Sequence, residues 1–112
     1  MNSDIQAKVS QLSMIEQNLQ QYAMQKQQFQ AQLLEVESAS KELVDAKEHY
    51  KIIGNIMVLK KKEDLVKELN EKKEILNVRV DSFEKQEAKL KERAEKLQSE
   101  LMQEMKNEEK GE

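Results

Sequence analysis

The apolar residues in the first half of the chain are spaced alternately three and four residues apart, and this spacing restricts the fold more than any other feature. With seam positions at 5 and 8 in the first seven-residue repeat, ten of the fourteen seam sites between 5 and 50 are apolar. They are Ile5, Leu12, Ile15, Leu19, Tyr22, Phe29, Leu33, Val36, Leu43 and Tyr50, and the four polar sites are Lys8, Lys26, Ser40 and Lys47. This heptad pattern predicts a helix that packs along a second helix.

The predicted first helix begins near residue 4, because Ser3 and Gln6 have the spacing of a capping box. We expect it to continue to about residue 48. At about 1.5 Å per residue it would be about 65 to 70 Å long. A helix of this length, far above the average in globular domains, needs a partner helix.

The partner is predicted in the second half of the chain, where nine of twelve seam sites between 66 and 104 are apolar. These are Val66, Leu69, Leu76, Val80, Phe83, Leu90, Ala94, Leu97 and Leu101. Glu63 and Asp64 place negative charge at the helix start, so we expect a helix from about 63 to 108 and a short C-terminal tail. Two matched helices joined by a short link predict an antiparallel coiled coil, as one domain over residues 1–112.

The link between the helices contains "YKIIGNIMVLKKK", residues 50–62. Gly54 and Asn55 form a two-residue loop between two apolar runs, which predicts a β-hairpin over about residues 50–60 with a primed turn. In the expected register Ile53 lies opposite Ile56, although a slip of one residue remains an alternative. The fold class is therefore mainly α, with a single β-hairpin at the bend of the coiled coil.

This hairpin would be apolar on both faces, and a lone two-stranded ribbon is marginal in water. Its unpaired edges and apolar side chains favour pairing with other strands. We expect hairpins from several subunits to assemble into an intersubunit sheet or β-barrel. The residues expected to take part in assembly are Tyr50, Ile52, Ile53, Gly54, Asn55, Ile56, Met57, Val58 and Leu59.

Composition argues against several other functions. The net charge of −3, from 19 basic and 22 acidic residues, is unlike that of a nucleic-acid-binding domain. The chain has no cysteine, His49 is its single histidine, and it has no glycine-rich phosphate loop. We therefore expect no metal, no cofactor and no enzymatic activity. With neither a membrane-spanning run nor a signal peptide recognisable, a cytoplasmic location is expected.

Two heptad helices joined by one hairpin, with a glutamine-rich first helix, resemble the beta-type subunit of prefoldin. The resemblance is most specific in "YKIIGNIMVLKKKEDLVKEL", residues 50–69, and an archaeal origin is expected. Alpha-type subunits have two hairpins at this place. "KKKED" departs from the pattern because no capping residue precedes the second helix. The resemblance implies a heterohexamer of two alpha and four beta subunits that captures unfolded proteins at coiled-coil tips, without ATP, and delivers them to a group II chaperonin.

The expected client site lies near the two chain ends, where the chain has more apolar residues than a two-helix seam needs. It comprises Ile5, Val9, Leu12, Met14, Ile15, Leu97, Leu101, Met102 and Met105. Flexible methionine side chains suit the binding of varied apolar segments, and the acidic tail "EMKNEEKGE" is expected to contact the chaperonin. Alternatives are a loosely packed tip without a partner, and a passive coiled-coil spacer or RNA-gripping arm. Neither a spacer nor an RNA-gripping arm explains an apolar ribbon at the bend.

Overall fold

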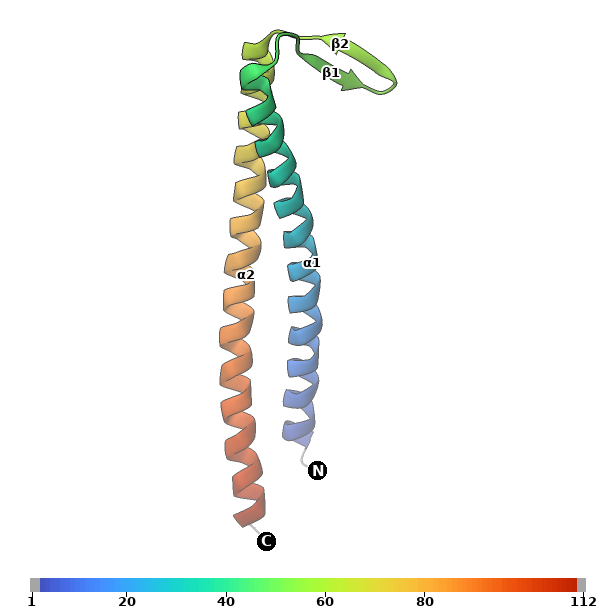
Figure 1. The fold of residues 1–112 in the computed structure, drawn as a ribbon. Coiled ribbons are helices and arrows are strands. Elements are labelled where there is room, and N and C mark those ends of the chain that lie inside the picture. The colour runs from blue at the N-terminus through green and yellow to red at the C-terminus, as the bar shows by residue number, and fades with distance from the viewer. Residues whose placement is uncertain (1–2, 111–112) are drawn as a thin grey trace. The chain divides into compact units, whose positions relative to one another are not determined.

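The structure is a computed structural model that describes residues 3–110. In chain order it contains helix α1 (Ser3–Asp45), strand β1 (Tyr50–Ile53), strand β2 (Ile56–Leu59) and helix α2 (Lys62–Lys110) (Figure 1). The prediction of two long helices with one hairpin between them is confirmed. The chain divides into two compact units, here named the terminal unit (residues 3–25 and 82–110) and the hairpin unit (residues 26–81). The expectation of one domain over the whole chain stays a prediction.

The predicted seam of α1 is confirmed residue by residue. Within this helix the buried and half-buried side chains are those at the predicted seam sites from 5 to 43, and every other described side chain is exposed. Even the polar seam residues Lys8, Lys26 and Ser40 are half-buried. The position of a residue in the repeat therefore determines whether its side chain is buried or half-buried, for polar and apolar residues alike.

Within each unit the two helices run antiparallel. In the terminal unit the rings of Tyr22 and Phe83 lie 5.7 Å apart. In the hairpin unit the Arg79 guanidinium lies 5.4 Å from the centre of the Phe29 ring, and Lys73 Nζ lies 3.9 Å from Glu37 Oε1. The partner number on α2 falls as the α1 number rises, as an antiparallel pair requires.

The apolar seam sites of α2 follow the prediction from Leu69 onward, but the first site does not, and the polar seam site Lys73 is exposed. Val66, expected in the seam, is 38% exposed, whereas Leu65 is only 9% exposed. Leu65 lines a groove together with Leu43 and Tyr50, beside the bend of the chain. The start of α2 is therefore oriented by the end of α1 and the hairpin, and the heptad repeat applies only farther along the helix.

Helix α1 ends at Asp45, before the expected end near residue 48. Lys47, which the repeat placed in the seam, is exposed, so no seam contact supports a further turn. The last carbonyl groups of α1 accept hydrogen bonds from side chains beyond the helix: His49 Nε2 donates to Leu43 O at 3.2 Å, and Lys62 Nζ to Val44 O at 3.4 Å. These bonds satisfy groups that a helix end leaves without intrahelical partners.

Helix α2 continues to Lys110, past its expected end near residue 108. The expected acidic tail "EMKNEEKGE" is thus helical up to that residue, and its last two residues lie outside the described part of the chain. All of residues 104–110 except Asn107 are glutamate, methionine or lysine, which are good helix formers, and this accounts for the continuation.

The predicted register of the hairpin is confirmed, and the alternative slip is excluded. The Cα pairs are Tyr50 with Leu59, Lys51 with Val58, Ile52 with Met57, and Ile53 with Ile56. Gly54 has a φ of 60°, and no other residue in 3–110 has a positive φ. A positive φ at the first central residue alone indicates a type II′ turn. Lys60 N donates to His49 O at 2.8 Å and closes the base of the hairpin.

Candidate protein-binding surfaces

The hairpin presents exposed apolar side chains on both of its faces, which we together call the hairpin surface. Six of its apolar side chains are at least 46% exposed, and only Val58 is half-buried. The exposed six are Tyr50, Ile52, Ile53, Ile56, Met57 and Leu59. The hairpin unit leaves these six side chains largely uncovered. Exposed apolar side chains gathered on one element are typical of a surface that contacts another protein.

Polar contacts hold the base of the hairpin while its strand edges stay open. Lys51 Nζ donates to Glu68 Oε1 at 2.9 Å, which links β1 to α2. The Tyr50 hydroxyl donates to Glu48 Oε2 at 2.7 Å, and this hydrogen bond raises the pKa of Tyr50. In the described part of the chain β1 and β2 pair only with each other, so each strand has an unpaired edge. Figure 1 shows the hairpin extending sideways from the point where α1 ends and α2 begins.

A groove lies at the base of the hairpin, between β1 and the two helices. Its apolar lining comprises Ala39 and Leu43 of α1, Tyr50 and Ile52 of β1, and Leu65 and Leu69 of α2. Glu42, Lys51, Glu68 and Lys72 also line it. The sequence analysis did not assign Ala39 or Leu65 to any surface. The adjacent Leu65 and Val66 offered two choices for one seam site, and only the geometry of the bend decides between them.

The second candidate surface lies in the terminal unit and divides the nine predicted client-binding residues into two groups. Ile5, Ile15 and Leu97 are buried in the seam, and Leu12 and Leu101 are half-buried. Val9, Met14, Met102 and Met105 are exposed, and we call these four the terminal apolar residues. Of the nine, only these four are mostly exposed while the helices stay paired.

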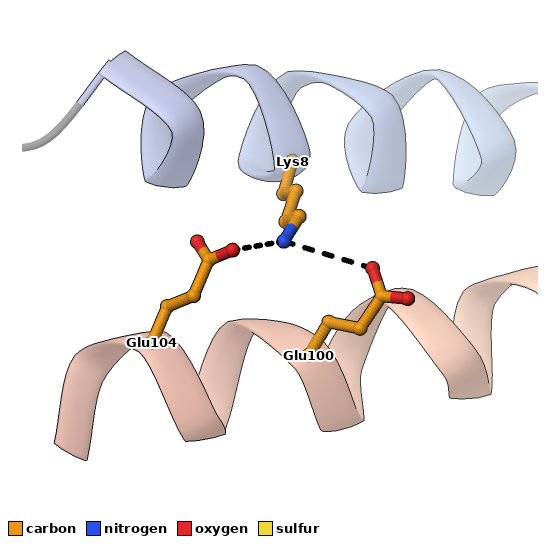
Figure 2. A network of polar contacts seen from close by, with 3 residues as sticks. All are labelled: Lys8, Glu100 and Glu104. Atoms are coloured by element: carbon orange, nitrogen blue, oxygen red, sulfur yellow. Dashed lines mark hydrogen bonds and ion pairs between the residues drawn. The ribbon is translucent and has the colours of Figure 1, made fainter. Parts of the chain in front are cut away.

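An ion cluster joins the two helices in the same unit. Figure 2 shows Lys8 reaching from α1 to two glutamates of α2. Its Nζ donates to Glu104 Oε1 and lies 3.6 Å from Glu100 Oε2. Residues 100 and 104 are four apart and share one helix face. The hydrogen bond to Glu104, reinforced by the negative charges of both glutamates, raises the pKa of Lys8.

The sequence analysis noted Lys8 as a polar seam residue but did not pair it. The sequence did contain a signal for this pair, because Glu104 is also at a polar seam site. It lies near the C-terminal end of the second helix, which an antiparallel coiled coil places beside the start of the first. Residues of opposite charge at seam sites that face each other across the two helices are candidates for an ion pair.

Comparison with known proteins identifies the family. The family described as "Prefoldin subunit" matches residues 6–108. The chain belongs to the prefoldin family. It is 41% identical over 100 residues to the prefoldin subunit beta of Archaeoglobus fulgidus, covering 87% of this chain and 86% of that protein. It is 40% identical over 96 residues to prefoldin subunit beta of Pyrococcus horikoshii, covering 83% and 82%.

The fold agrees with a solved prefoldin structure. The crystal structure of the prefoldin beta subunit from Thermococcus strain KS-1 matches with a TM-score of 0.87 and 34% identity. The match covers 92% of this chain and 93% of that one. The predicted resemblance to beta-type prefoldin subunits, and with it a chaperone-type role, is confirmed.

Two further observations bear on what this prefoldin chain presents. Residues 3–110 contain no group of three or more histidine, cysteine or acidic side chains suited to a metal ion. His49 is already bonded to the carbonyl of Leu43. Neither α1 nor α2, over the residues described, is long and apolar enough to cross a bilayer.

Proposed function

We propose that the chain is the beta subunit of a prefoldin heterohexamer that holds unfolded proteins without ATP and delivers them to a group II chaperonin. The observation that carries this proposal is that a prefoldin-family chain exposes apolar side chains in two different regions, on the hairpin and at the four terminal apolar residues. Each surface is given one role: the hairpin surface binds other subunits, and the terminal apolar residues bind clients. The proposal places the complex in the cytoplasm and includes no cofactor and no catalytic step.

The assembly role is supported by the hairpin surface. Six exposed apolar side chains and two open strand edges on one small element are costly in water. Strands of neighbouring subunits would cover both, as expected for β-barrels built from the hairpins of two alpha and four beta subunits. Gly54 and Asn55 contribute by forming the turn that fixes the register of the pair.

The client role is supported by the chemistry of the terminal apolar residues. Met102 and Met105 lie one turn apart on α2, and both are more than half exposed. Their unbranched, polarizable side chains can adapt to unrelated apolar segments. Ile5, Leu12, Ile15, Leu97 and Leu101 would add to this surface where the helix ends separate. We assign the acidic C-terminal segment to the chaperonin contact.

The test uses the full complex, made by co-expression with an alpha-type subunit. Met102→Gln with Met105→Gln removes apolar surface while keeping good helix formers. The matched control is Met24→Gln, because Met24 is also in the terminal unit and is 65% exposed. The measurement is suppression of aggregation of a chemically unfolded protein, together with the mass of each complex.

We expect the double variant to assemble normally and to lose most of its protective effect, and the control to retain it. Full protection by the double variant would show that these methionines are not the client site. A correctly assembled wild-type complex that gives no protection would overturn the proposed function and favour a passive coiled-coil scaffold.

A further inference from the structure

The ion cluster of Lys8, Glu100 and Glu104 occupies a place that a coiled coil normally fills with apolar side chains. Lys8 is at a seam site, and its side chain is only 21% exposed. A charged residue in the seam lowers the stability of helix pairing, but it selects the register in which its partners face it. The cluster therefore fixes the register and makes pairing weaker than an apolar seam would, but loss of either partner would leave a shielded charge uncompensated.

The closed cluster is incompletely satisfied. Glu104 accepts a hydrogen bond at Oε1, whereas its Oε2 is shielded from solvent and has no hydrogen-bond partner among the described residues. A shielded carboxylate oxygen without a donor loses hydration and gains nothing in return. This cost is relieved when the two helices separate, so the closed state is held only weakly at this point.

Lys8 lies between two apolar seam residues of the proposed client site, and on α2 Glu104 follows two others. Ile5, Lys8 and Leu12 are successive seam sites on α1, and Leu97, Leu101 and Glu104 are successive seam sites on α2. Ile5 is only 3% exposed while the helices are paired. If the contacts of Lys8 break, the flanking apolar side chains lose their cover.

We propose that Lys8, Glu100 and Glu104 form an ionic latch that controls exposure of the apolar seam in the terminal unit. At low ionic strength the latch keeps the helix ends paired in one register. Salt screens charges at shorter distances as its concentration rises, with a screening length of about 10 Å at 0.1 M and about 3 Å at 1 M. High salt therefore opens the latch and uncovers Ile5, Leu12 and Leu101. The consequence for clients rests on the proposed function, but the opening itself does not.

The opening is measured by amide hydrogen exchange on the assembled complex, in peptides covering residues 3–12 and 97–108, at about 0.05 and about 0.5 M KCl. In the wild type we expect exchange in both peptides to rise several-fold with salt. Lys8→Met with Glu104→Leu places apolar side chains at both polar seam sites and leaves no shielded charge without a partner, so exchange becomes slower and its salt dependence is lost. Glu100→Gln with Glu104→Gln leaves the lysine without negative partners, so exchange is already fast at low salt.

Two further variants isolate the electrostatic cause. Lys8→Glu with Glu100→Lys and Glu104→Lys reverses every charge, and it should restore low-salt protection and salt dependence. Lys73→Met is the matched control, because Lys73 was also expected at a seam site but its ion pair with Glu37 is exposed and lies in the hairpin unit. This control should leave exchange in residues 3–12 and 97–108 unchanged. Salt dependence that persists in the variant Lys8→Met with Glu104→Leu, or is missing from the wild type, would overturn the latch.

Aggregation assays on the same complexes separate the latch from the proposed function. We expect the variant Lys8→Met with Glu104→Leu to protect an unfolded protein about twofold to fivefold less well than the wild type at low salt, and the double glutamine variant to protect it better. Exchange that follows the prediction without any change in protection would keep the latch and remove the seam residues from the client site. A wild type without protection would contradict the holdase function, whereas the exchange result would still decide whether the latch exists.

Discussion

The hairpin surface and the terminal apolar residues both consist of exposed apolar side chains. They differ in the backbone that carries these side chains, strand or helix, and in the flexibility of the side chains. Ile52, Ile53 and Ile56 are β-branched and have few rotamers, and they lie on strands whose register and open edges are fixed. Met102 and Met105 are unbranched and lie on a helix whose backbone groups are already bonded. Rigid side chains beside unpaired strand edges suit a partner of one fixed geometry. Flexible side chains on a helix whose backbone groups are already hydrogen-bonded suit partners of many shapes.

The largest effect should follow from charging the hairpin surface. Ile53 and Ile56 are opposite each other across the strand pair, and replacing both with Asp buries charge at the proposed subunit contact, at a cost of several kcal/mol. Sedimentation should show dissociated subunits, and circular dichroism should show that most helix remains. Ile75→Asp with Val78→Asp, an exposed apolar pair of α2, is the control that should keep the native mass. An unchanged oligomer in the Ile53 and Ile56 variant would contradict the assembly role.

A smaller effect is expected from straining the hairpin without charging it. Gly54 has a φ of 60°, and an added Cβ would meet nothing within 4 Å, so any cost of Gly54→Val comes from the backbone. That cost is about 1 to 2 kcal/mol or more for a β-branched residue. The complex should dissociate at higher protein concentrations than the wild type in a dilution series. Asn55→Ala, at a residue without positive φ, should change this little; equal effects of the two variants would argue against the strain.

The comparison predicts a still smaller and more selective effect when the methionines are made rigid. Met102→Ile with Met105→Ile keeps the surface apolar but removes its adaptability. Protection should fall by about twofold for some unfolded proteins and stay unchanged for others, as measured by aggregation assays with a panel of clients. In the hairpin, Met57→Ile should leave assembly intact. Uniform protection across the panel would show that apolar area alone determines client binding.

The smallest effect concerns the protonation of Lys8. Its pKa is raised above the ordinary value of 10.5, so its contribution to stability is present below that pH and is lost as the pH rises through the higher folded-state value. The melting temperature of the wild type should therefore fall more steeply than that of Lys8→Met above about pH 10.5. Parallel curves for the two proteins would show that the lysine adds no net stability.

Sequence reasoning was most successful where one local repeat or turn determines the structure. The heptad repeat identified every sheltered position of α1, and Gly54-Asn55 set the register of the hairpin. It was less successful where distant groups meet. The end of α1 depends on a bond from Lys62 to Val44, 18 residues earlier. The pairing of Lys8 with Glu104 joins residues 96 positions apart, and a repeat shows which sites face inward but not which residues face each other.

The bonds around the end of α1 determine how the hairpin can be moved between proteins. Its base is tied by residues outside both strands, through His49 to Leu43, Lys60 to His49, and Glu68 to Lys51. In a chimera that exchanges only residues 50–59, the new strands would lack the partners of these hydrogen bonds. They would be joined to flanking residues that do not match them. The transplantable cassette therefore runs from about Leu43 to Leu69, which also includes the shifted Leu65. In this chain the unit of exchange for altering partner choice is nearly three times as long as the hairpin of residues 50–59.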